Sequence, residues 1–242
     1  MEYTWRQKVI AEGVGTFALV FVGAGTILSL QGSLDAGGTR VAIALAHGLT
    51  IAVMVTTFGH ITGGHFNPAV TLGILTARKI DPDLAVKYIA AQVLSAALAA
   101  AALIAIYPDP AQWGGTNIGN PEPSPLLNEG QVILVEAILT FFLVMAVMGT
   151  GVDKRGAWGA VAGLAIGLTI VFDILMGGAL TGAAMNPARS FGPTLIAFAA
   201  GVNSTGGGVG LWANHLLYWV GPVLGGVMAG GLYDGLYLRE RK

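Results

Sequence analysis

The sequence contains no cysteine. Disulfide bonds, thiolate metal sites and cysteine nucleophiles are therefore excluded, while the cellular compartment stays open. A long basic block is missing as well, and the formal net charge at pH 7 is −1. Nucleic-acid binding as the main function is excluded on this ground, because the neutralisation of phosphates requires clustered Lys and Arg.

Charged residues are scarce throughout the chain. Asp, Glu, Lys and Arg make up 10% of the 242 residues, whereas soluble domains carry roughly a quarter. Hydrophobic residues amount to 54%, and 37 residues are Gly, which is frequent at contacts between membrane helices. So few charges cannot cover a soluble fold, and we expect an all-α integral membrane protein.

The apolar stretches predict how the chain crosses the membrane. A transmembrane helix needs about 20 mostly apolar residues, and two further segments, 67 to about 76 and 186 to about 200, are too short to span the bilayer core. We predict six transmembrane helices plus two re-entrant half-helices, and an extended loop over 108–130. The six spans are expected at residues 8–30, 40–59, 84–106, 131–150, 157–177 and 212–236.

The positions of the basic residues predict the orientation. All Lys and Arg residues except Arg40 and Arg189 fall on one side of these spans, and that group includes Arg239, Arg241 and Lys242 at the C-terminus. Because positive residues stay on the cytoplasmic side, we expect both termini in the cytoplasm. The expected location is the plasma, or cell inner, membrane.

An internal repeat relates the two halves of the chain. Residues 62–73 align with residues 181–192, and Glu12 and Glu136 occupy equivalent positions, each with Thr four residues later. The repeats cover about 1–110 and 130–242 within a single domain of residues 1–242. Each repeat holds three spans, an odd number, so the second copy enters the membrane from the opposite side. Such inverted repeats place a site near the membrane midplane, between broken helices.

The two short segments both begin with Asn-Pro-Ala. Asn67 and Asn186 suit the N-cap position, with Pro68 and Pro187 at the first helical position. A single Asn-Pro-Ala is most simply a capping motif, but two copies in register within an inverted repeat indicate a functional site. The cap uses the amide oxygen, so we expect both amide N–H donors of each Asn to remain free. Two positive helix ends would then converge at the midplane and repel cations.

These motifs resemble those of the aquaporin, or major intrinsic protein, family, through both Asn-Pro-Ala boxes, their flanking residues and Tyr218-Trp-Val-Gly-Pro. The resemblance implies an hourglass pore and a homotetramer with one pore per subunit. Ser190 after the second box, with Tyr218 and Trp219, resembles the water-selective branch. The residues implied to line the pore at the boxes are Asn67, Pro68, Ala69, Asn186, Pro187 and Ala188.

The resemblance also implies a selectivity filter of His47, Ile174, Ala183 and Arg189. This set is similar to that of plant tonoplast intrinsic proteins, a group associated with ammonia, urea and other small neutral solutes besides water. An additional loop histidine of the ammonia-conducting members has no counterpart in residues 108–130. The chemistry of Arg189 independently indicates a position in the pore, because a guanidinium at membrane depth must line water or find a partner. There it would donate to passing oxygens and repel cations.

Four further ionisable residues lie in the apolar segments. Glu12 and Glu136 either accept hydrogen bonds from the backbone of the re-entrant loops or form a proton relay. His65 either lines the cytoplasmic vestibule or braces its loop. Asp173 has no assigned role, and a donor on a neighbouring helix could pair with it.

The expected function is that of a passive water channel that excludes protons and ions, with small neutral solutes such as ammonia or urea as additional candidates. The expected partners are water, these solutes, membrane lipid and further copies of the chain in a homotetramer. No enzymatic activity, cofactor or metal is expected. The alternative is an ion-coupled secondary transporter that uses Glu12 and Glu136 within the membrane.

Overall fold

The computed structural model describes residues 2–31, 36–156, 159–201, 212 and 214–238, so the basic C-terminal residues Arg239, Arg241 and Lys242 lie outside it. In this part of the chain, six long α-helices and two short ones make up most of the structure. The long helices are α1 (Trp5–Ser29), α2 (Ala36–Thr62), α4 (Pro82–Ile106), α5 (Glu129–Val147), α6 (Gly159–Thr181) and α8 (Leu217–Tyr233). The short helices are α3 (Pro68–Thr76) and α7 (Pro187–Ala199).

Five helical segments among the described residues are long and apolar enough to cross a membrane. They contain α1, α2, α4, α5 and residues 161–181 of α6. They include the first five predicted spans except residue 30 of the first and residues 157–160 of the fifth. The sixth predicted span is wrong at its start. Residues 214–216 form turns, helix α8 begins only at Leu217, and a π-helical turn over Asp234–Leu238 extends it.

The loop between α4 and α5 also differs from the prediction. The prediction is an extended loop, but the structure contains two 3₁₀ turns there, η1 (Pro110–Gln112) and η2 (Gly114–Gly119). Asn117 and Ile118 in η2 adopt left-handed φ angles of 46° and 58°. Of the prolines of this loop, Pro110 and Pro125 lie in turns, and η2 packs against α1 and α7.

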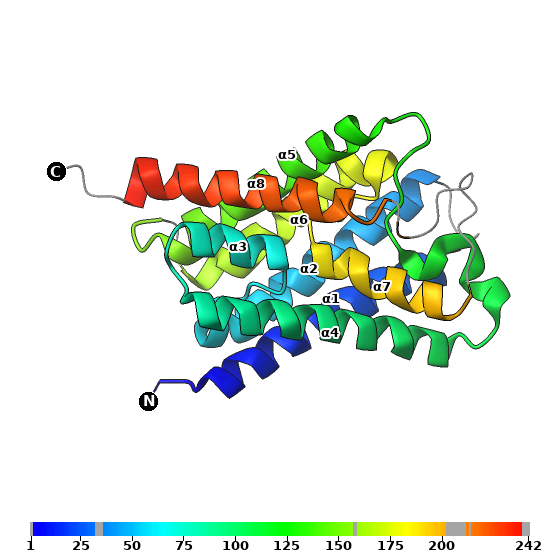
Figure 1. Cartoon of the computed structure of the whole chain (residues 1–242), viewed down its shortest axis with the longest axis horizontal. Helices are drawn as coiled ribbons and strands as arrows, with labels where there is room; N and C mark the ends of the chain where they lie inside the picture. The colour runs from blue at the N-terminus through cyan, green and yellow to red at the C-terminus, as the bar shows by residue number, and fades with distance from the viewer. Residues whose placement is uncertain (1, 32–35, 157–158, 202–211, 213, 239–242) are drawn as a thin grey trace.

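Helices α3 and α7 lie inside the bundle and approach its middle from opposite ends, so that their N-termini meet there (Figure 1). Around them, α1 packs on α4, α2 on α6, and α5 on α8. Helix α3 is held against α8, and α7 against α4. The expectation of six long helices with two half-helices is confirmed, and the site predicted from the two boxes is placed at the centre of the bundle.

Polar capping fixes where several of these apolar helices begin. Thr4 with Gln7 forms a capping box at the start of α1, and Asn128 with Gln131 forms one at the start of α5. Asn67 and Asn186 cap α3 and α7, each followed by Pro at the first helical position. These side chains satisfy backbone N–H groups that would otherwise lack a partner at a helix start.

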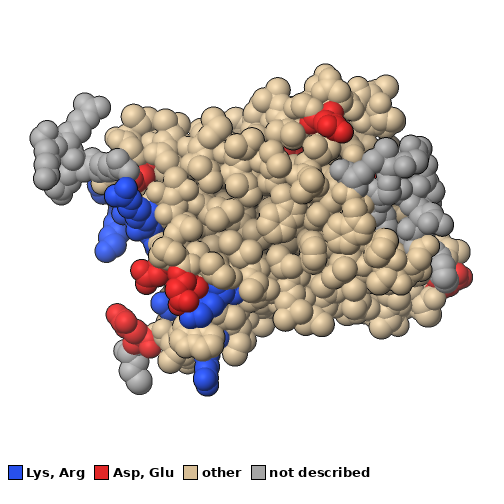
Figure 2. Space-filling model, in the orientation of Figure 1, with Lys and Arg blue, Asp and Glu red and all other residues tan. Residues whose placement is uncertain are grey.

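The exposed charges gather at the ends of the bundle on the face that Figure 2 shows. Lys and Arg lie at the end with the described N- and C-terminal segments, and the flank between the two ends carries few charged residues. Exposed apolar side chains of the long helices are large and aliphatic or aromatic, such as Leu94, Leu168 and Phe172. Apolar side chains suit a surface that faces lipid.

Glycine allows α3 and α8 to approach closely. A Cβ atom built on Gly230 of α8 would lie 2.1 Å from the carbonyl oxygen of Gly73 in α3. The neighbouring Gly231 would bring its Cβ no closer than 3.6 Å to any atom, the methyl group of Thr76. Position 230 therefore requires glycine for packing, whereas position 231 does not.

We expect Gly230→Ala to destabilise the protein and Gly231→Ala to leave it unchanged or slightly more stable. The first substitution forces two backbones apart, which costs roughly 1–3 kcal/mol, whereas the second only adds a methyl group to a helix, which favours helix formation by about 0.5–1 kcal/mol. Thermal unfolding of the purified variants in detergent measures both effects. Equal melting temperatures would show that the contact between α3 and α8 is not close-packed.

Candidate functional site

The loop that leads into α3 is held by the carboxylate of Glu12, which is fully buried. Its Oε1 atom accepts from the hydroxyl group of Thr62 at 2.7 Å and from the backbone N–H of His65 at 2.9 Å. Its Oε2 atom accepts from the backbone N–H of Phe66 at 2.6 Å and from the side chain of Gln92 at 2.8 Å. One side chain thus satisfies the donors of a loop that is buried at membrane depth.

Glu136 holds the loop before α7 in the same way. Its Oε1 atom accepts from the hydroxyl group of Thr181 at 2.6 Å and from the backbone N–H of Ala184 at 2.9 Å. Its Oε2 atom accepts from the backbone N–H of Met185 at 2.7 Å. The two carboxylates therefore occupy equivalent positions in the two repeats, each bound to the loop before its half-helix.

Sequence reasoning missed the residues that complete these loop sites. The hydroxyl groups of Tyr88 and Tyr218 donate to the carbonyl oxygens of Thr62 and Thr181, at 3.1 and 2.6 Å. Gln92 binds Glu12 but has no hydrogen-bonded counterpart at Glu136 among the described residues. Tyr88 follows Asn67 by 21 residues and Tyr218 follows Asn186 by 32 residues, so spacing does not reveal the tyrosine pair, and no sequence signal marks Gln92.

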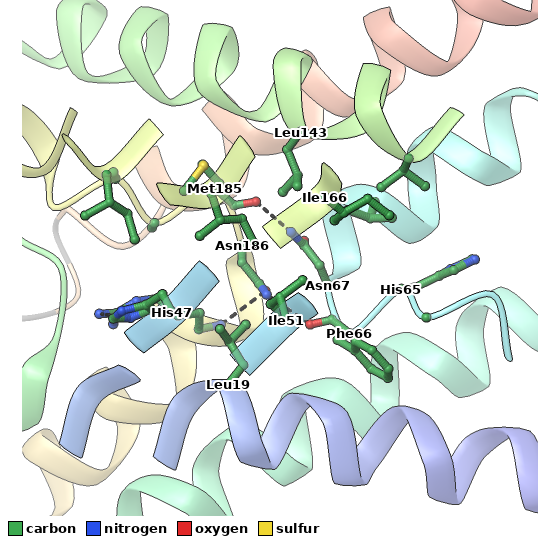
Figure 3. A pocket seen from close by; sticks show the side chains of 18 residues that line it. Leu19, His47, Ile51, His65, Phe66, Asn67, Leu143, Ile166, Met185 and Asn186 are labelled. Carbon is green, nitrogen blue, oxygen red and sulfur yellow. Dashed lines mark hydrogen bonds between the residues drawn. The ribbon is translucent and has the colours of Figure 1, made fainter. Parts of the chain in front are cut away.

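The side chains of Asn67 and Asn186 link the two boxes to each other. The Nδ2 atom of Asn67 donates to the carbonyl oxygen of Met185 at 2.7 Å, and the Nδ2 atom of Asn186 donates to that of Phe66 at 3.0 Å (Figure 3). Each Oδ1 atom caps its own helix, with Ala69 N–H at 2.8 Å and Ala188 N–H at 3.0 Å. The expectation that both N–H donors stay free is therefore wrong, because one N–H of each amide closes this reciprocal link.

Arg189 and His47 face each other in the same cavity. The Nδ1 atom of His47 lies 2.9 Å from the carbonyl oxygen of Ile43, so the proton belongs on Nδ1 and the lone pair on Nε2. That Nε2 atom lies 3.3 Å from Nη2 of Arg189, whose Nη1 donates to the carbonyl oxygen of Gly119 at 2.8 Å. Two of the five guanidinium N–H donors are thus engaged, and three are left for other acceptors.

A narrow cavity of about 30 Å³ runs past these groups, and we name it the pore cavity. A water molecule requires about 10–15 Å³ measured in this way, so only a few fit. The two Asn side chains lie between His47 and His65 in Figure 3. All four predicted filter residues contribute to the wall, namely His47, Ile174, Ala183 and Arg189.

The pore cavity opens into a wider space at each end. Ile174 and Arg189 are shared with a cavity of about 400 Å³, which we name the Arg189 vestibule. His65 and Val147 are shared with a cavity of about 700 Å³, which we name the His65 vestibule. Wide, narrow and wide spaces therefore follow one another through the bundle.

Most of the remaining pore wall is aliphatic and was not predicted. Ile166, Ile170 and Ile174 of α6 lie four residues apart and form one stripe along the pore cavity, opposite the polar groups of the boxes. Residues four apart share one face of a helix. This spacing could have identified the stripe from the sequence once Ile174 was placed in the pore.

His65 and Asp173 differ in their hydrogen-bond partners. His65 lies at the junction of the pore cavity and the His65 vestibule, and its Nδ1 atom lies 3.1 Å from the hydroxyl group of Thr71. Asp173 is fully buried, and neither of its carboxylate oxygens has a hydrogen-bond partner among the described residues. The predicted donor on a neighbouring helix is therefore absent from this part of the chain, and nothing in the structure explains Asp173.

A narrow passage with a few polar groups in its wall joins two vestibules through a bundle of apolar helices, and this arrangement defines an integral membrane channel. The chain belongs to the major intrinsic protein family, because the match to that family, described as "Major intrinsic protein", covers residues 2–233. The resemblance to aquaporins is thereby confirmed. The limits of the two repeats and the roles of the individual site residues stay predictions.

Named relatives agree with this assignment. The chain is 40% identical to aquaporin TIP4-4 of Zea mays, over 97% of this chain and 88% of that protein. It is also 40% identical to aquaporin-4 of Bos taurus, over 97% of this chain and 68% of that protein. An X-ray structure of the aquaglyceroporin from Plasmodium falciparum superposes with a TM-score of 0.83 at 23% identity, covering 96% of this chain and 97% of that one, which supports the fold.

We expect Glu136→Gln to lower the melting temperature in detergent strongly. The new amide group turns an N–H donor toward backbone N–H groups, and each lost charge-assisted hydrogen bond costs about 1.5–3 kcal/mol. Glu129→Gln, at an exposed position at the start of the same helix, is the matched control. If both variants melt together, the carboxylate of Glu136 does not hold the loop.

Proposed function

We propose that this channel conducts water passively, in either direction, down the osmotic gradient. The observation that carries the proposal is the pore cavity of about 30 Å³, in which the two box amides, Arg189 and two histidines share a mostly aliphatic wall. Its width suits molecules of the size of water. Small neutral solutes such as ammonia or urea are proposed as additional substrates, because Ala183 adds little bulk to the wall.

The polar groups of the pore cavity replace the hydrogen bonds that a molecule loses when it leaves bulk water, but only at a few points. Each box amide keeps its second N–H for a passing oxygen, next to the N-termini of α3 and α7. Arg189 offers further donors, and Nε2 of His47 offers an acceptor. Along the stripe of Ile166, Ile170 and Ile174 a molecule finds no partner, which keeps binding weak enough for rapid passage.

Cations are opposed at two levels of the route. Both half-helix N-termini carry partial positive charge at the boxes, and Arg189 adds a full charge beside the pore cavity. A cation that enters also loses its water shell against aliphatic side chains, which is costly. We therefore propose that transport is electrically silent.

No observation favours the alternative of an ion-coupled transporter. Both carboxylates that it would use are occupied. Glu12 accepts four hydrogen bonds, one of them from Gln92 of α4, and Glu136 accepts three. Neither residue lines the pore cavity or a vestibule. Among the described residues there is also no cluster of His, Cys, Asp and Glu that could hold a metal ion, and we propose no cofactor and no enzymatic activity.

The assembly and orientation complete the proposal. We propose a homotetramer in the lipid of the plasma, or cell inner, membrane, with both termini in the cytoplasm. The gathering of Lys and Arg at the end that carries the described terminal segments supports this orientation (Figure 2). The His65 vestibule would then face the cytoplasm and the Arg189 vestibule the opposite side.

Stopped-flow light scattering on proteoliposomes tests the function directly. We expect osmotic water permeability well above that of empty liposomes, without a proton current and without sensitivity to a protonophore. Gradients of glycerol, urea and ammonia in the same preparation give the solute permeabilities. Water flux that depends on a pH gradient would contradict a passive channel.

We expect Asn186→Asp to raise cation leak. A carboxylate at the meeting point of two positive helix ends neutralises the barrier there. The substitution also loses the bond to the carbonyl oxygen of Phe66, so Asn186→Ser serves as a control that can cap the helix without adding charge. Sodium and proton fluxes into liposomes measure the effect, and equal leak in the two variants would refute the electrostatic barrier.

We expect Ile174→His to lower the ratio of solute to water permeability. The ring adds bulk and a donor beside Arg189, which obstructs solutes larger than water. Water permeability should stay within about threefold, a barrier change under 1 kcal/mol. Ile174→Leu preserves the apolar wall and is the control. An unchanged ratio in a correctly assembled Ile174→His variant would show that this residue does not select solutes.

A further inference from the structure

Arg40 is a basic residue that the membrane topology does not explain. Together with Arg189, it lies on the side of the membrane opposite to the other Lys and Arg residues of the sequence, where positive charge is disfavoured near spans. The structure places both of these exceptions in the wall of one cavity, the Arg189 vestibule. Their coincidence in a space of about 400 Å³ calls for a functional reason.

The position of Arg40 is fixed by packing against α6. Its Cγ and Cδ atoms lie 3.7 and 3.9 Å from where a Cβ of Gly178 would be, so the aliphatic part of the side chain rests on the helix turn that follows Ile174. Arg40 precedes His47 by two helical turns, about 10 Å along α2. The ring of His47 contacts the guanidinium of Arg189, so the two arginines lie at successive levels of the route.

Neither guanidinium is neutralised by an ion pair within the described part of the chain. Arg40 has no ion pair or side-chain hydrogen bond there, and Arg189 binds only a carbonyl oxygen and a neutral imidazole. Among the described residues, the wall of the vestibule contains one acidic side chain, Glu122, and it already accepts from the side-chain amide of Asn117. The described charged groups of the wall therefore sum to a positive field over the pore entrance.

The walls strengthen this field. Ile27, Ile43, Ile174 and Ala179 are aliphatic and line the same vestibule, and walls of low polarity focus the field of charges within a cleft. Guanidinium groups present planar pairs of N–H donors that match the oxygens of phosphate, sulfonate or carboxylate groups. The pore cavity beyond is too narrow and too apolar to let such an anion pass.

We propose that the Arg189 vestibule binds a small oxyanion between Arg40 and Arg189, and that the bound anion obstructs the entrance to the pore cavity. Arg40 provides the site with its specificity for anions, and Glu122 in the same wall limits the affinity. The obstruction of flux rests on the proposed channel function, whereas the binding itself does not.

Two probes of one chemistry test the site. Inorganic phosphate and methanesulfonate are oxyanions, and dimethyl sulfone is the neutral counterpart of methanesulfonate. Isothermal titration calorimetry on the purified full chain measures binding, and stopped-flow experiments with the probe on both sides of the proteoliposomes measure obstruction. We expect both anions to bind at millimolar concentrations, to reduce water permeability by at least half at saturation, and to weaken as ionic strength rises, while dimethyl sulfone has no effect.

Substitutions in the vestibule should move the affinity in opposite directions. We expect Arg40→Gln to weaken phosphate binding at least tenfold, Arg40→Lys to restore most of it, and Glu122→Gln to tighten it about threefold. Arg78→Gln removes the same charge from the His65 vestibule at the other end of the bundle and is the matched control. For each variant, permeability is compared with and without anion, so that changes in the unliganded channel cancel.

The outcomes separate this proposal from the proposed function. Absence of water flux with intact phosphate binding would contradict the channel function alone. Failure of calorimetry to detect either anion, or equal weakening by Arg40→Gln and Arg78→Gln, would overturn the oxyanion site. Anion binding that depends on Arg40 but leaves water flux unchanged would overturn the obstruction of the entrance.

Discussion

Two buried carboxylates allow irregular backbone to exist in the middle of this bundle. The loops before α3 and α7 bring N–H groups to membrane depth, where an unsatisfied donor costs several kcal/mol. Phe66 and Met185 in these loops have left-handed φ angles of 50° and 51°, which cost roughly 1–2 kcal/mol each for residues other than Gly. Glu12 and Glu136 offset these costs with hydrogen bonds to the same two residues.

The link between the boxes depends on this support. With the loops held, the carbonyl oxygens of Phe66 and Met185 face the amides of Asn186 and Asn67, and each half-helix is tied to the other through a side chain that also caps its own start. Two positive helix ends that would repel each other are thereby kept together. The same geometry leaves one N–H per amide for a passing molecule and holds both amides in the wall of the pore cavity.

The distribution of charge follows from the same architecture. A channel for neutral molecules requires donors without a mobile counter-charge, and the structure supplies them as helix N-termini, amides and the guanidinium of Arg189. One carbonyl oxygen and a neutral imidazole engage two N–H donors of that guanidinium without cancelling its charge. The Arg189 vestibule extends this pattern outward with Arg40, so positive field and aliphatic wall occur together along the route.

The sequence by itself determined the membrane class, five of the six spans to within a few residues, and the residues of the boxes, because hydropathy, charge and repeated motifs are local properties of the chain. It also pointed to His47, Ile174, Ala183 and Arg189, which the structure brings to one cavity. Only the tertiary structure decided which distant residues accept hydrogen bonds from the box amides and from Arg189. The amides of Asn67 and Asn186 donate across 118 and 120 residues, and Arg189 reaches Gly119. Such contacts depend on the packing of α3 and α7 within the bundle, which no single stretch of sequence specifies.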